Sequence, residues 1–171
     1  MVLKPGDDPR VSALLDSWLV PGPMQAITAF PEWEAISAAL SATDAGNREL
    51  AKLGRFVLQP AIRHGDFARW NLLDTVESGI IALDWEWSMP AGLPGCDLAH
   101  YFAQDARLVH RLAPAEVCRR VTRDLESPEN RKYLNHCGWN GDARAVLIAM
   151  LAYTVGTGQQ MNAEVLAAAL A

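Results

Sequence analysis

The feature that most constrains the fold of this chain is a short β-type segment enclosed by helical sequence. Between residues 60 and 87 the apolar residues come in short pieces, at Ala61-Ile62, Leu72-Leu73 and Ile80–Leu83. Turn-forming residues, Glu77-Ser78-Gly79, separate the last two pieces, which predicts a small β-hairpin flanked by loops. On both sides apolar residues recur at helical spacing. We therefore expect an α+β fold that is mainly α-helical.

The helical sequence falls into a part before the hairpin and a longer part after it. Apolar spacing and helix-start residues predict helices over residues 11–19, 31–42 and 47–58. After the hairpin, Asp97 is a candidate N-terminal cap, and helices are expected from it to residue 102 and over residues 114–125, 128–137 and 142–157. We expect one domain over residues 1–171, with a helical lead-in (1–59), a loop and hairpin (60–87) and a second helical part (88–171).

The charge balance argues against a nucleic-acid partner. The chain has 15 basic and 20 acidic side chains, a net charge of -5, whereas nucleic-acid binders usually carry a basic excess. Its densest basic group, at Arg119, Arg120 and Arg123, is followed at once by Asp124, which is typical of a solvated helix face. An acidic surface suits a cationic small-molecule substrate.

Cysteine usage and hydropathy predict a cytoplasmic protein without a membrane contact. The three cysteines, Cys96, Cys118 and Cys137, form no C-x-x-C pair, and we expect them to be small buried side chains. Pairing of Cys96 with His100, or of His136 with Cys137, on a metal is the disfavoured alternative. The longest apolar run, residues 145–153, is too short to span a bilayer, and the first 30 residues do not resemble a signal peptide.

Polar residues that suit phosphoryl chemistry gather around the β-type segment. Residues 64–71 read HGDFARWN, which places Asp66 and Asn71 five residues apart, and Asp84 follows the second strand of the predicted hairpin. Oxygen donors of this kind are the ligands that Mg²⁺ prefers, and a carboxylate such as Asp66 can accept a proton from a substrate hydroxyl. The alternative is that these side chains only satisfy backbone donors in turns.

The motifs HGDFARWNLL, ALDWE and GLPGCDLA, in this order, resemble the aminoglycoside phosphotransferase and choline kinase superfamily, small-molecule kinases with a protein-kinase-like fold. The resemblance covers about residues 60–102. It implies the C-terminal lobe of that fold, with residues 60–87 as catalytic loop and hairpin and residues 88–171 as a helical substrate subdomain.

The resemblance implies a role for each polar residue. Asp66 becomes the catalytic base, and Asn71 and Asp84 become ligands of Mg²⁺ and the nucleotide. His64 and Asp97 become structural supports of the loop. Arg69 stands where many relatives have Pro, which adds a positive charge near the phosphates.

Four other residues near the loop are expected to be structural. Trp70, Trp85 and Trp87 are predicted to be packing residues rather than substrate platforms, because aromatic side chains usually serve the core. Glu86 is predicted to form local hydrogen bonds.

The sequence before His64 does not read as the β lobe that covers the phosphates in such kinases. Neither Lys4 nor Lys52 lies on a predicted strand, and no glycine-rich nucleotide loop precedes the motif. The glycines at 156 and 158 are interpreted as a helix interruption. We therefore expect the N-terminal β lobe to be absent from these residues.

Two functions follow from these observations. The first is ATP- and Mg²⁺-dependent phosphoryl transfer to a hydroxyl of a small molecule such as an aminoglycoside, choline or a sugar, by the catalytic lobe of a truncated kinase or of one completed by a partner chain. The second is an inactive kinase-like binding or scaffold protein. A magnesium-dependent phosphohydrolase explains less of the motif order. In each case a homodimer or a partner chain would cover the face left by the missing lobe.

For a cationic acceptor, the sequence suggests acidic side chains after residue 94. The candidates are Asp105, Asp124, Glu126 and Glu129.

Overall fold

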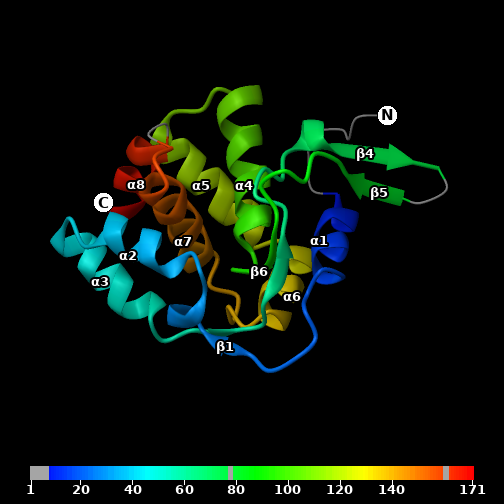
Figure 1. Ribbon diagram of the computed structural model, residues 1–171. Coiled ribbons are helices and arrows are strands. Elements are labelled where there is room, and N and C mark those ends of the chain that lie inside the picture. Colours follow the sequence, from blue (N-terminus) through cyan, green and yellow to red (C-terminus); the bar gives the residue numbers. More distant parts are fainter. Residues whose placement is uncertain (1–7, 77–78, 160–161) are drawn as a thin grey trace.

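A helix-rich body carries a β-hairpin that projects from one side in the computed structural model (Figure 1). The structure describes residues 8–76, 79–159 and 162–171. The expected fold class, α+β and mainly helical, is confirmed at this level.

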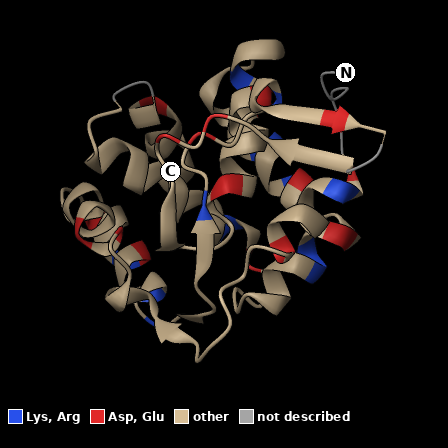
Figure 2. Cartoon of the chain, turned by 45° about the vertical axis from the view of Figure 1, so that its right-hand side comes forward, with Lys and Arg blue, Asp and Glu red and all other residues tan. Residues whose placement is uncertain are grey.

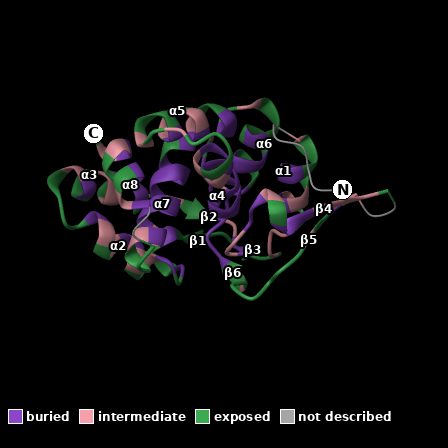
Figure 3. Cartoon of the chain, turned by 90° about the horizontal axis from the view of Figure 1, so that it is seen from above, coloured by how far each residue is buried: buried purple, intermediate pink, exposed green. Residues whose placement is uncertain are grey.

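The core is built around α7, Ala143–Gly156, which is buried on nearly all sides. A helix that is apolar all round is stable only inside a protein. Four helices cover it: α2 (Trp33–Leu40), α4 (Cys96–Gln104), α5 (Pro114–Leu125) and α8 (Ala163–Leu170). Figure 3 shows α7 and α4 as the buried centre of the molecule, with the hairpin extending away from it.

The strands form three separate antiparallel pairs in the described residues. In the predicted hairpin, β4 (Leu72–Thr75) pairs with β5 (Gly79–Ala82), and Leu72 lies opposite Ala82. This prediction is confirmed, although turn residues 77 and 78 lie outside the described residues. The other pairs are β3 (Ala61–Arg63) with β6 (Met89–Gly92), and β1 (Gln25–Ala26) with β2 (Val57–Leu58). They were not predicted because their partners lie far apart in the chain, without the short turn that identifies a hairpin.

A second helical pair supports the hairpin. Helix α1 (Pro9–Asp16) contacts α6 (Pro128–His136) and β5. Arg10 of α1 also bonds both carboxylate oxygens of Asp74 in β4, at 2.9 and 3.0 Å. The hairpin is therefore attached to the body through α1, at a residue near its turn.

Most helices lie where the periodicity predicts them, within one to three residues at their ends. The helix predicted over residues 47–58 is wrong in its bounds: α3 runs over Asp44–Leu53, because Thr43 caps it by accepting a bond from the Gly46 N–H. Residues Val57–Leu58 then form β2 instead.

Three details of the C-terminal half differ from expectation. The N-cap of α4 is Gly95, in a left-handed conformation, and Asp97 lies in the first turn. The helix continues as a π-helical segment, η3, over Asp105–Val109. Helix α8 was not predicted. As expected, α7 ends at Gly156.

No helix within the described ranges combines the length and the apolar character that a membrane span needs.

The contact between α2 and α7 depends on a glycine. A methyl group added to Gly156 would lie 2.2 Å from the backbone oxygen of Ala35, so Gly156→Ala must push the helices apart. We expect a loss of about 1–3 kcal/mol in the free energy of unfolding, measured by urea denaturation. Gly54→Ala is the matched control, because its nearest atom would be 3.5 Å away and its φ of -58° suits alanine. Equal losses in both variants would contradict this account.

Candidate active site

The loop between β3 and β4 is attached to α4 through the carboxylate of Asp97. Its Oδ2 accepts a hydrogen bond from the His64 N–H at 2.6 Å, and its Oδ1 accepts one from the Gly65 N–H at 3.1 Å. Gly65 has a φ of 87°, and a methyl group there would lie 2.4 Å from the backbone oxygen of Trp87. Only glycine fits such a position. The predicted support of the loop by Asp97 is thus present in the structure.

His64 joins the loop to the end of the hairpin. Its side chain is fully buried, and its Nε2 lies 2.7 Å from the backbone oxygen of Leu83. Because a carbonyl only accepts, Nε2 carries the hydrogen, and Nδ1 accepts from the Asp66 N–H at 3.4 Å. Its ring also packs against Trp85, with centroids 4.8 Å apart. These contacts agree with the structural role expected for His64.

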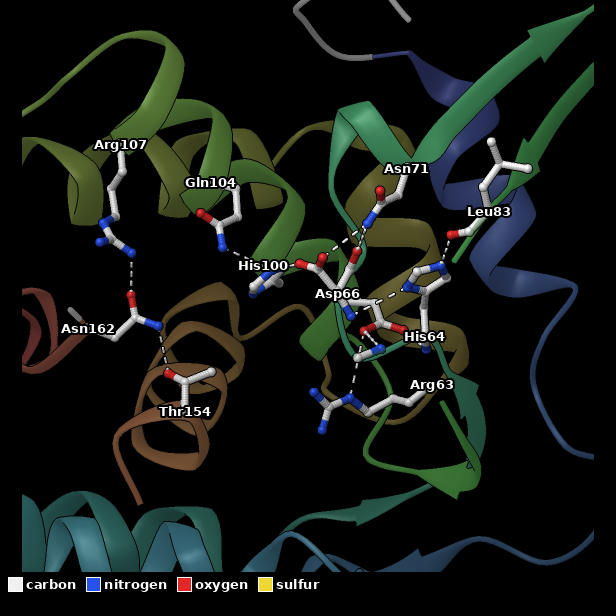
Figure 4. Close-up of polar contacts among 12 residues, drawn as sticks. Arg63, His64, Asp66, Asn71, Leu83, His100, Gln104, Arg107, Thr154 and Asn162 are labelled. Carbon is white, nitrogen blue, oxygen red and sulfur yellow. Dashed lines mark hydrogen bonds and ion pairs between the residues drawn. The ribbon is translucent and has the colours of Figure 1, made fainter. Parts of the chain in front are cut away.

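Asp66 is held through both of its carboxylate oxygens (Figure 4). Oδ1 lies 3.2 Å from Nε2 of His100, and Oδ2 accepts a hydrogen bond of 3.0 Å from Nδ2 of Asn71. The hydrogen bond from His100 is the largest influence on its pKa, which lies below the usual value although partial burial opposes the charge. The side chain remains 40% exposed, so the ionised carboxylate is open to solvent on one side.

Asn71 and Asp84 are brought near one another by the hairpin ladder. The N–H of Leu83 donates to the backbone oxygen of Asn71 at 2.8 Å, so Leu83 lies opposite Asn71. Asp84 is the next residue along the chain. Nδ2 of Asn71 donates to Asp66, so its Oδ1 remains as an acceptor. Asp84 is exposed, has a left-handed φ of 64°, and makes no side-chain hydrogen bond to the described residues.

The donor chemistry of these two side chains fits a magnesium ion only in part. An amide oxygen and a carboxylate are suitable ligands when waters and phosphate oxygens complete the shell. Among the described residues, however, no three His, Cys, Asp or Glu side chains come together in a way that could hold a metal ion. The site would therefore need the nucleotide phosphates as further ligands.

A buried ion pair lies beneath the loop. Nη1 of Arg63 in β3 bonds to Oε1 of Glu32 at 3.0 Å, and Nε of Arg63 lies 3.7 Å from Oδ1 of Asp97. These three side chains are 5% exposed or less. The guanidinium also stacks 4.5 Å from the ring centre of Tyr153, on α7. Arg63 thus joins the core to the carboxylate that holds the loop.

A second arginine ties the other end of the loop to the helical body. Nη1 of Arg69 lies 3.3 Å from Oδ1 of Asp105, and Oδ2 of Asp105 lies 3.2 Å from His110. Arg69 therefore joins the loop to η3.

Of the four acidic candidates for a cationic acceptor, two already have cationic partners. Asp105 is buried against Arg69, and Asp124 is buried against Arg120 and Arg123 on α5. Glu126 and Glu129 are exposed, and Glu129 lines a cleft between α1 and α6 that shares no residue with the loop. Figure 2 shows basic and acidic residues interspersed over the helices.

The packing role predicted for three tryptophans agrees with the contacts of Trp85, but Trp70 and Trp87 need correction. Trp70, Trp85 and Trp87 are 44%, 38% and 68% exposed, and only Trp85 has ring contacts, with Trp18 and His64. The buried tryptophan is Trp139, whose Nε1 donates to the backbone oxygen of Pro94.

The disfavoured metal pairings of cysteine and histidine find no support. Cys96 is fully buried, and burial raises the pKa of its thiol to about 12, while His100 faces Asp66. The ring of His136 contacts Asp16. Cys137 is buried, as expected, and burial raises the pKa of its thiol well above the usual value.

Three residues of the site were missed by sequence reasoning: Glu32, Arg63 and His100. His100 follows Asp97 by three residues, so the two must share a face of one helix, and this signal was available. Glu32 and Arg63 are 31 residues apart, and nothing local indicates their pairing.

Comparison of the chain with protein-family models, with curated proteins and with solved structures found no match.

Removing the buried charge of Arg63 should lower the free energy of unfolding. Arg63→Met leaves the charges of Glu32 and Asp97 unpaired in the core, so we expect the free energy of unfolding to fall by about 3 kcal/mol or more. The double variant Arg63→Met/Glu32→Gln should recover part of this loss, because one unpaired charge is gone. Lys52→Met breaks the exposed pair with Glu49 and should change stability by less than about 1 kcal/mol. A double variant less stable than the single one would contradict the account.

The contribution of Asp66 to stability should depend on pH. Its pKa in the folded state lies below its ordinary value of 3.8, so the ionised carboxylate stabilises the fold above that value, and this contribution is lost as pH falls through the folded pKa. The difference in unfolding free energy between the wild type and Asp66→Asn should therefore shrink on acidification from about pH 6 to about pH 3. Urea denaturation across this range measures it; a difference that grows on acidification would contradict the assignment.

Proposed function

We propose that this chain is the catalytic lobe of an ATP- and Mg²⁺-dependent phosphotransferase that acts on a hydroxyl group of a small molecule. The observation that carries the proposal is the state of Asp66. Its carboxylate is held at both oxygens, and one side remains open to solvent on a loop braced from the core. A group that only satisfied backbone donors would need no such arrangement.

Asp66 is the base of the proposed reaction. An acceptor hydroxyl that approaches its exposed side would give its proton to the carboxylate as its oxygen bonds to the γ-phosphorus of ATP, while the bond from that phosphorus to ADP breaks and ADP leaves. The bonds from His100 and Asn71 fix the direction of the carboxylate, so that little reorganisation is needed.

Asn71 and Asp84 are the residues that would hold magnesium. Oδ1 of Asn71 is left as an acceptor because its nitrogen donates to Asp66, and the Asp84 carboxylate is exposed beside the same strand end. A bound magnesium ion would supply neutralisation of the phosphate charge.

The part of the reaction that these residues do not supply is the cover over the phosphates. In the described residues ahead of β3, the chain forms α1, α2, α3 and two-residue strands rather than a β lobe. Lys52 is an exposed residue of α3 paired with Glu49, and Lys4 lies outside the described residues. This observation favours the second candidate function, a kinase-like binding or scaffold protein. A partner chain that covers the loop face would supply the missing cover over the phosphates, and this chain could then serve as the catalytic lobe.

Calorimetric titration with Mg-ATP decides between the two functions. For the proposed phosphotransferase we expect binding at millimolar nucleotide or below, weakened at least about tenfold by Asp84→Ala, because a phosphate-linked ligand is removed. Glu86→Ala is the matched control, since it removes an exposed carboxylate two residues away and should leave binding unchanged.

The outcomes separate clearly. Binding that is lost in Asp84→Ala and kept in Glu86→Ala supports the phosphotransferase. The absence of binding at millimolar Mg-ATP would reject it for this chain and favour the binding protein.

A further inference from the structure

The Asp66 carboxylate has a second partner that the sequence motifs do not include. Asn71 belongs to the loop itself, but His100 comes from α4, 34 residues away, and its Nε2 lies 3.2 Å from Oδ1 of Asp66. The His100 side chain is 8% exposed, whereas that of Asp66 is 40% exposed. His100 is therefore the buried member of the pair and reaches Asp66 from α4 (Figure 4).

The chemistry of this contact determines which atom carries the hydrogen. An ionised carboxylate only accepts hydrogen bonds, so Nε2 of His100 must donate to Oδ1, whether the ring is neutral or charged. The two carboxylate oxygens then receive one donor each, Nε2–H of His100 on Oδ1 and Nδ2–H of Asn71 on Oδ2. Two donors from different elements hold the plane of the carboxylate as well as its position.

Gln104 lies on the same side of α4, one turn after His100. As placed, its Nε2 lies 3.1 Å from Nε2 of His100, which would set two donors against each other, while its Oε1 is buried without a hydrogen-bond partner among the described residues. A half-turn of the amide removes both conflicts, since Oε1 then faces the His100 N–H. His100 would share its hydrogen between Asp66 and Gln104.

We propose that His100 is a positioning residue for Asp66: its Nε2–H holds Oδ1 from α4, and the carbonyl oxygen of Gln104, which shares that hydrogen, helps to orient the His100 ring. Its catalytic consequence rests on the proposed function, because it matters only if Asp66 is the base that meets the acceptor hydroxyl. The contact also explains why the loop is attached to α4 twice, through Asp97 at its start and through His100 at its functional carboxylate.

The first arm of the test needs no activity. In ¹⁵N-labelled protein, two-bond ¹H–¹⁵N correlation spectra of the histidine rings report which nitrogen carries the hydrogen. We expect a protonated Nε2 for His100, with its proton signal shifted downfield and then moved upfield in Asp66→Asn. Gln104→Glu should preserve the protonated Nε2, because it presents only oxygen to the ring.

The second arm measures turnover. His100→Leu removes the donor at similar volume, and we expect kcat for phosphoryl transfer to fall at least about tenfold while KM for Mg-ATP changes less than about twofold. His100→Gln keeps a donor near the Nε2 position and should restore kcat to within about threefold of the wild type. Circular dichroism and urea denaturation of each variant check that the fold is kept.

The spectroscopic arm tests the contact between His100 and Asp66, and the turnover arm tests its role in catalysis, so each can be contradicted without the other. An unprotonated Nε2, or ring signals unchanged in Asp66→Asn, would overturn the positioning role whatever the activity. A protonated Nε2 that responds to Asp66→Asn, in a protein without turnover or Mg-ATP binding, would support the contact and reject the proposed function. Equal loss of kcat in His100→Leu and His100→Gln would show that the donor does not serve catalysis.

Discussion

The candidate site depends on one buried carboxylate. Asp97 lies in the first turn of α4 and receives the backbone N–H groups of His64 and Gly65, which fixes the direction in which the chain leaves β3. A carboxylate is stable in such a place only if its charge is balanced. Arg63 lies beside it and is itself paired with Glu32, so a chain of three buried charges joins the loop to the helical core. Without this balance the loop would lose its attachment to the buried core through Asp97.

The same loop shows how two polar side chains of one motif are given different roles by their surroundings. His64 is fully buried, and both of its ring nitrogens are used within the fold. Asp66, two residues later, is partly exposed, has a lowered pKa and keeps one side free of protein. Because His64 is buried, its side chain supports the fold. Because Asp66 is partly exposed, its carboxylate can meet a ligand from solvent.

Much of the local structure could be predicted from the sequence. The β4–β5 hairpin follows from two short apolar pieces around a turn, and α5 begins at Pro114 and ends at Leu125 as its periodicity indicates. Predictions were poorer where tertiary contacts decide. Val57–Leu58 extends a helical apolar pattern but forms β2 because β1 lies beside it. Trp87 was expected in the core and is exposed, since spacing alone does not tell which large apolar residue the body will enclose.

For the site, the sequence by itself determined the residue types and their order: Asp66 and Asn71 on one loop, Asp84 after the second strand of the hairpin, and Asp97 at the start of the next helix. Such order follows from local motifs, because loop and strand lengths limit where neighbouring residues can go. Only the tertiary structure decided that His100 meets Asp66, that Arg63 and Glu32 pair beneath the loop, and that Asp84 remains exposed. These contacts join residues 31 to 34 positions apart, or depend on solvent access, and both are set by how the helices pack.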